Sequence, residues 1–109
     1  MTNQPLDAEE GLEPVEAEQE CYVLKLYITG LTPNSRRAVE NIKNICEEHL
    51  QGRYQLEVVD IYQQPELAKK EQIVAVPTLI KQLPSPLRRL IGDMSDTEKV
   101  LIGLNLLKS

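Results

Sequence analysis

The stretch YVLKLYI at residues 22–28 decides the fold class of this 109-residue chain. Strand-forming residues fill it and its apolar run is almost continuous, which is typical of a central strand. The following segment GLTPN (30–34) ends the strand and offers Thr32 or Asn34 as a helix cap, with Pro33 suited to the first helical turn. A strand that leads directly into a helix predicts an α/β domain.

The rest of the chain continues the alternation of strands and helices. Apolar residues recur at helical spacing from Ser35 to Leu50, and Gly52 follows as a stop. Residues 54–61 alternate like a strand, and Pro65 opens a short helix expected to reach about Gln72. We then expect a buried strand at 73–80, a turn at 84–86, a hairpin partner at 87–91, and a helix opened by the capping box SDTE at 95–98. This order is that of a thioredoxin-like fold.

The acidic residues are concentrated at the N-terminus. Residues 1–20 carry seven Asp or Glu and no Lys or Arg, whereas residues 21–109 carry 12 basic and 10 acidic residues. The first segment has little apolar content with which to offset the entropy of ordering, so we expect a disordered extension at 1–20 and one domain at 21–109. Two roles stay open for the extension: a solubilising tail, or an electrostatic shield over a basic patch such as Arg88 and Arg89.

Composition argues against two classes of partner. No apolar run approaches the roughly 20 residues that a membrane span requires, and the N-terminus lacks the pattern of a signal peptide. We therefore expect a cytoplasmic protein. Residues 21–109 are nearly neutral and lack basic residues interleaved with aromatic ones, which argues against nucleic-acid binding.

The side chains that common catalytic sites require are missing or misplaced. A thioredoxin-type thiolate must lie at the start of the helix after the first strand, but Cys21 precedes that strand and Cys46 lies near the far end of the helix. We expect both cysteines to be reduced and mostly structural. His49 is the only histidine, which leaves no multi-histidine metal site, and no glycine-rich phosphate loop is present. We expect no enzyme activity, metal or cofactor.

Four segments of the chain resemble one family. They are YVLKLY (22–27), TPNS (32–35), AVPTL (75–79) and the gapless block IGDMSDTEKVLIGL (91–104). Together they resemble the KaiB family of bacterial circadian clock proteins over about Tyr22 to Leu107.

The resemblance implies a non-enzymatic protein that binds the ADP-bound N-terminal ATPase ring of a KaiC-like protein. In such clocks the complex sequesters KaiA and competes with a KaiB-like sensor histidine kinase. The resemblance also implies two folds of one chain: a resting homo-oligomer, dimer or tetramer, in a family-specific fold, and a thioredoxin-like monomer that binds KaiC. The C-terminal half exchanges helices for strands between them.

Five residues are the expected fold-switch positions. Gly103 lies inside a predicted helix, where glycine costs about 1 kcal/mol relative to alanine. Pro77 stands where thioredoxin folds hold a cis proline, and Pro84 and Pro86 bracket a turn that would change partners. Asn105 replaces the Asp that the resemblance leads us to expect.

Four further residues are expected to contact the partner: Arg37, Tyr54, Glu57 and Gln72. Glu57 and Gln72 stand where clock-type relatives are expected to have Lys, which indicates a divergent homologue whose output could be stress adaptation instead of timekeeping. Two alternatives remain at this point. One is a thioredoxin-like adaptor that does not switch fold, and the other is a thiol oxidoreductase whose thiol has moved.

Overall fold

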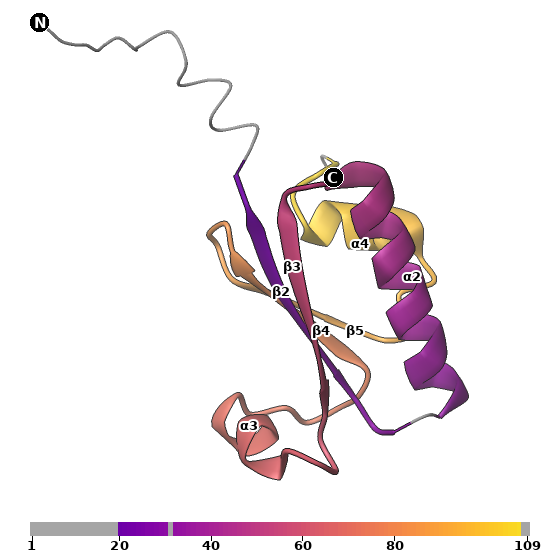
Figure 1. Cartoon of the computed structure of the whole chain (residues 1–109), viewed down its shortest axis with the longest axis vertical. Helices are drawn as coiled ribbons and strands as arrows, with labels where there is room; N and C mark the ends of the chain where they lie inside the picture. Colours follow the sequence, from indigo (N-terminus) through magenta and orange to yellow (C-terminus); the bar gives the residue numbers. More distant parts are fainter. Residues whose placement is uncertain (1–19, 31, 108–109) are drawn as a thin grey trace, which may run out of the picture.

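The computed structural model describes residues 20–30 and 32–107, so the predicted disordered extension lies almost entirely outside the described residues. Strands and helices follow in the predicted order (Figure 1). They are β2 (Tyr22–Ile28), α2 (Pro33–His49), β3 (Tyr54–Asp60), α3 (Pro65–Lys70), β4 (Thr78–Leu83), β5 (Arg88–Ile91) and α4 (Thr97–Gly103).

The strands form one four-stranded sheet in the order β3-β2-β4-β5. Strand β2 pairs in parallel with β3 and antiparallel with β4, and β5 returns antiparallel to β4. The apolar stretch at residues 22–28 is therefore a central strand, as predicted. Strands β3 and β5 are the two edges.

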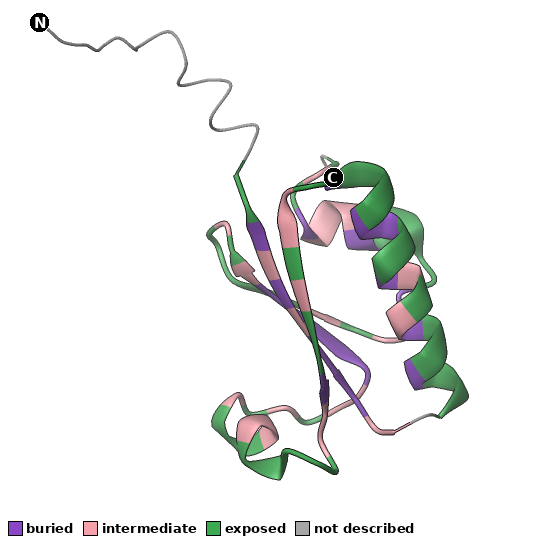
Figure 2. Ribbon diagram, in the orientation of Figure 1, coloured by how far each residue is buried: buried purple, intermediate pink, exposed green. Residues whose placement is uncertain are grey.

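Two helices cover one face of the sheet and the third covers part of the other. Helices α2 and α4 lie together on one side, and α3 lies on the opposite side (Figure 1). The main core lies under α2 and α4 and includes Leu24, Leu26 and Leu79, all at most 1% exposed (Figure 2). A smaller cluster of Tyr27, Val59 and Ile80 lies on the α3 side, which we call the open face.

The start of α2 follows from its sequence. The Thr32 hydroxyl accepts a hydrogen bond from the Ser35 N–H at 3.2 Å, and Pro33 occupies the first turn, where no partner for a backbone N–H is needed. Apolar residues at helical spacing are then buried against the sheet, including Ala38, Ile42 and Cys46. Of the two caps that the sequence allowed, the structure has Thr32.

Two sequence-based boundaries were wrong. The strand expected at 73–80 begins only at Thr78 and extends to Leu83. Pro77 has no N–H to donate to a neighbouring strand. Before it, Ile73 and Val76 pack against the core without joining the sheet, whereas Val74 is 91% exposed and not buried as expected. The last helix is capped by Asp96, whose carboxylate accepts from the Lys99 N–H at 3.2 Å, one residue later than the predicted box.

Within residues 20–30 and 32–107, none of the helices has the length and apolar character that crossing a bilayer would need.

Candidate functional site

The turn before α2 carries hydroxyl groups where a thioredoxin-type enzyme carries cysteine. The Ser35 hydroxyl is buried and accepts a hydrogen bond from the Thr29 N–H at 3.1 Å, so its oxygen helps to join β2 to α2. Cys46 is fully buried in α2, and burial raises the pKa of its thiol to about 12. Cys21 is exposed ahead of β2. Among the residues that the structure describes, no three His, Cys, Asp or Glu side chains cluster as a metal site would.

The two cysteines should differ sharply in reactivity. A disulfide reagent such as DTNB should modify Cys21 quickly in the native protein at about pH 8, because thiolate formation and access control this reaction. Cys46 should react only after unfolding, since its thiol is buried and its pKa is raised to about 12. Mass spectrometry of the modified peptides measures both rates. Comparable native-state rates for the two thiols would contradict the buried position of Cys46.

Helix α4 is joined to the first strand by a hydrogen bond between the two ends of the domain. The Tyr22 hydroxyl on β2 donates to the Leu104 carbonyl just after α4, with 3.0 Å between the oxygens, and both residues are buried. The last carbonyls of a helix have no partner within the helix, so this phenol supplies one where water has no access. Burial raises the pKa of Tyr22, although Arg53 acts in the opposite direction. The hydroxyl therefore stays protonated and able to donate at neutral pH.

Gly103 allows α4 to lie close to β5. A Cβ added at this position would lie 2.7 and 2.8 Å from the two methyl carbons of Leu90, well inside the usual contact distance of carbon atoms. The residue expected to weaken the helix thus also has a packing role, which the sequence did not indicate.

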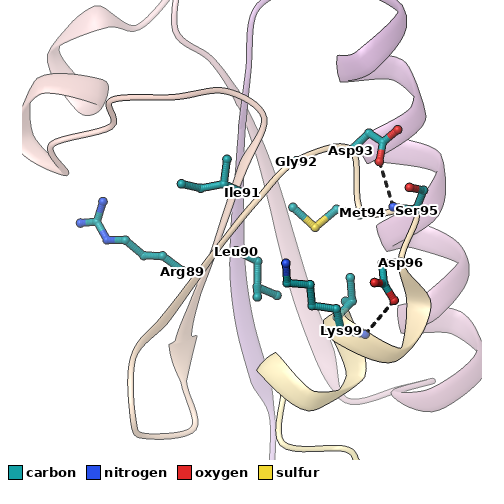
Figure 3. Close-up of a pocket in the computed structure, with 10 residues that line it drawn as sticks. Arg89, Leu90, Ile91, Gly92, Asp93, Met94, Ser95, Asp96 and Lys99 are labelled. Atoms are coloured by element: carbon teal, nitrogen blue, oxygen red, sulfur yellow. Dashed lines mark hydrogen bonds between the residues drawn. The ribbon is translucent and has the colours of Figure 1, made fainter.

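A cleft of about 390 Å³ opens beside this contact, between β5, the loop that follows it and the start of α4. Leu90 and Met94 lie along it, and Arg89 points to the other side of β5 (Figure 3). The carboxylates of Asp93 and Asp96, which also line the cleft, accept hydrogen bonds from backbone N–H groups at 3.1 and 3.2 Å. These acidic side chains therefore hold the loop and the helix start in place.

Helices α3 and α4 end in the same way, at two of the candidate residues. Gln72 and Asn105 have left-handed backbones, with φ of 56° and 63°. Each N–H donates to the carbonyl three residues earlier, and the next N–H donates to the carbonyl five residues earlier, over 2.8 to 3.0 Å. This is the Schellman arrangement, in which Asn is well tolerated and a longer side chain such as Gln is uncommon. Asn105 therefore favours the helical end that this fold requires.

The three candidate prolines lie at the two ends of β4. The peptide bonds before Pro77, Pro84 and Pro86 are all cis. The cis geometry expected at Pro77 is confirmed, and Pro84 and Pro86 occupy the turn between β4 and β5, as predicted.

The four expected partner-binding residues divide between the two sides of the sheet. The Arg37 Nε on α2 lies 3.2 Å from the Asp93 carboxylate, and the Tyr54 hydroxyl donates to a glutamate of α2 at 2.6 Å. Glu57 lies three residues along β3 from Tyr54, so its side chain points to the opposite face. Gln72 follows α3 on that same open face. The structure thus groups Glu57 with Gln72 and separates them from Arg37 and Tyr54.

Charged residues surround a buried phenol on the open face. One row of cross-strand neighbours consists of Glu57, Lys25, Ile80 and Arg89. Beside it, the buried Tyr27 hydroxyl has no hydrogen-bond partner in the described part of the chain. Burial raises the pKa of Tyr27, as do the nearby carboxylates of Glu71 and Glu57. An unused hydrogen-bonding group therefore lies beneath this charged surface.

Sequence reasoning missed Lys81, which is 1% exposed and donates from Nζ to the Pro84 carbonyl at 2.8 Å. A lysine between the apolar residues of TLIKQL (78–83) was the available signal. Tyr22 and Leu90 were missed because their roles arise from contacts with α4, which no local pattern reveals.

Solved structures with this architecture establish the class of protein. The N-terminal domain of Synechococcus elongatus SasA matches with a TM-score of 0.65 and 24% identity, covering 83% of this chain and 89% of that one. Mitochondrial thioredoxin 3 of Saccharomyces cerevisiae matches with a TM-score of 0.65 and 14% identity, covering 85% of each chain. At these identities the likeness concerns the fold alone. The chain thus has a thioredoxin-like fold in which the first covering helix begins without a cysteine.

Sequence relatives then establish the family. A family model described as the KaiB domain matches residues 25–106. The circadian clock oscillator protein KaiB of Microcystis aeruginosa is 57% identical over 89 residues, covering 82% of this chain and 86% of the relative. Its counterpart in Synechococcus elongatus is 56% identical, with 82% and 87% covered. The chain belongs to the KaiB family of circadian clock proteins.

Proposed function

We propose that the chain is a non-enzymatic regulator that binds the N-terminal ATPase ring of a KaiC-type protein in the cytoplasm, within a circadian or stress-response timing system. The observation that carries this proposal is the 57% identity with the KaiB of Microcystis aeruginosa over 89 residues. The hydroxyl groups at the start of α2 and the burial of Cys46 also favour binding over thiol chemistry.

The proposal includes a change of fold between a resting oligomer and the thioredoxin-like monomer. Helices α3 and α4 have six and seven residues, with no buried residue in α3 and only Val100 buried in α4. Helices this short are unstable in isolation, so their tertiary contacts must decide whether they form. A partner that binds only the thioredoxin-like form would shift the population towards it.

The open face around Glu57 and Gln72 is the proposed docking surface. Glu57 is exposed and lies opposite Lys25 on β2. The chain should form a complex with the KaiC-like ATPase of its own cell in the presence of ADP, measured by native mass spectrometry and co-purification. Absence of a complex at protein concentrations of tens of micromolar would contradict the proposal.

Matched charge reversals locate the docking surface. Glu57→Lys should strengthen binding to a clock-type KaiC by about tenfold or more, because the resemblance places Lys there in clock-type relatives and interfacial charge sets specificity. Glu40→Lys makes the same change at an exposed position of α2 and should leave the affinity unaltered. Equal effects of the two variants would place the docking surface elsewhere.

Gly103→Ala should raise the helical, monomeric population, because alanine favours a helix over glycine by about 1 kcal/mol. Leu90 must move to admit the new methyl group. The gain should therefore be larger in a Leu90→Ala background, by about 0.5 kcal/mol, the order of the cost of shifting the Leu90 rotamer. Circular dichroism and size-exclusion chromatography at a fixed chain concentration measure both populations. An identical gain in both backgrounds would argue against the Gly103–Leu90 contact. No gain in either background would show that Gly103 does not affect the balance between the two folds.

A further inference from the structure

The hairpin of β4 and β5 carries three cations that lack a carboxylate partner within the described residues. Lys81 donates to the Pro84 carbonyl, and Arg89 donates to two backbone carbonyls after α3 at 2.6 and 3.4 Å. Arg88 is exposed and faces Lys81 across the two strands. The ion pairs of the described part involve other residues. We refer to Lys81, Arg88 and Arg89 as the hairpin cations.

The acidic N-terminal segment enters the domain next to these cations. Val23 at the start of β2 pairs with Leu83, so the preceding residues emerge at the turn between β4 and β5 (Figure 1). Glu20 is the last acidic residue of that segment. Burial lowers the pKa of Lys81, and the positive charge of Arg88 lowers it further, whereas the Glu20 carboxylate acts in the opposite direction. The described end of the acidic segment therefore already acts electrostatically on the hairpin.

The rest of the segment has the composition to extend this interaction. Residues 1–19 contain six Asp or Glu and no Lys or Arg. Covalent geometry keeps Glu18 and Glu16 within about 14 Å of Glu20. The hairpin also exposes Leu83 and Leu87, at 51% and 55%, and the segment contains apolar residues of its own at positions 6, 12 and 15. The segment and the hairpin therefore carry opposite charges, and both contain apolar side chains that could pack together.

We propose that residues 1–19 dock in cis on the β4–β5 hairpin, with their carboxylates on Arg88 and Arg89 and their apolar side chains over Leu83 and Leu87. Because neighbouring residues of a strand point to opposite faces, Arg88 and Arg89 lie on the two sides of the β5 edge, and the proposed contact runs along that edge. The inference does not rest on the proposed binding of an ATPase.

Paramagnetic relaxation in the full-length chain tests the docking directly. A nitroxide is attached at Glu9→Cys, eleven residues ahead of Glu20, in a Cys21→Ser background, where Cys46 remains protected by burial. The amide signals of residues 88–91 should lose most of their intensity, whereas those of the exposed Lys43 and Asn44 on α2 should not. About 1 M NaCl, which shortens the Debye length to about 3 Å, should restore much of the lost intensity.

Matched variants and a mixing experiment separate the possible outcomes. Arg88→Ser together with Arg89→Ser should abolish the broadening, whereas Arg36→Ser, at an exposed position of α2, should preserve it. Broadening that survives the hairpin substitutions, or that is spread evenly over the domain, would overturn the proposal. A spin-labelled chain mixed with an isotopically labelled one should give no broadening, and intermolecular broadening would assign the segment to a second copy. No ATPase is present, so failure here is distinguishable from failure of the proposed function.

Discussion

Lys81→Met should raise the free energy of unfolding by about 1 to 4 kcal/mol. The Lys81 side chain is 1% exposed, and its ammonium group meets the neutral Pro84 carbonyl, while the Arg88 guanidinium repels it. Methionine keeps the apolar stem and removes the buried charge. Urea unfolding at about pH 7, at a fixed chain concentration, measures the change.

The same substitution should alter the dependence of stability on pH. Burial lowers the pKa of Lys81 in the folded state below its ordinary value of 10.5. Below the folded-state pKa both states are protonated, and the full cost of the buried charge is present. Between that pKa and 10.5 the unfolded chain binds more protons, so the stability of the unaltered protein should rise with pH. The advantage of Lys81→Met should therefore shrink across this window.

Two features make the pH experiment specific. Burial raises the pKa values of Tyr22 and Tyr27, which lowers the stability of both proteins above about pH 10 and cancels in their difference. Lys25→Met provides the control, because Lys25 is only half-buried on β2 and should change stability by no more than about 0.5 kcal/mol. A loss of stability in Lys81→Met would mean that the hydrogen bond to Pro84 outweighs the cost of burial.

Tyr22→Phe should lower the free energy of unfolding by about 1 to 3 kcal/mol. The substitution leaves the ring in the core and removes the hydroxyl that donates to the Leu104 carbonyl at 3.0 Å. That carbonyl would then be buried without a partner at the end of α4. Hydrogen exchange of the α4 amides should accelerate more than that of β2, because α4 is the element released.

Tyr54→Phe is the matched control for this substitution. Its hydroxyl donates to Glu47 at 2.6 Å on the surface, where water can replace the lost partner, so stability should change by no more than about 0.5 kcal/mol. An equal decrease in the free energy of unfolding in the two variants would show that the buried Tyr22 hydrogen bond stabilises α4 no more than an exposed one.

The candidate site was only partly predictable. Both cysteines could be placed away from the start of α2 from the sequence, and Gly103 could be assigned to the last helix. The shared left-handed role of Gln72 and Asn105 could not, because it requires the hydrogen bonds of both helix ends. Nor could the separation of Arg37 and Tyr54 from Glu57 and Gln72 be foreseen, since it depends on which sheet face the helices cover.

The sequence by itself determined the order of the elements, the central place of β2 and the capped start of α2, although only the structure decided for Thr32 over Asn34. These features depend on periodicity and on contacts within a few residues, which a local pattern encodes. Only the tertiary structure decided that β4 begins after Pro77, that Lys81 is buried, and that Tyr22 holds the end of α4. The last contact joins residues 82 positions apart, and its energy comes from the removal of both groups from water, which happens only when the two ends of the domain meet.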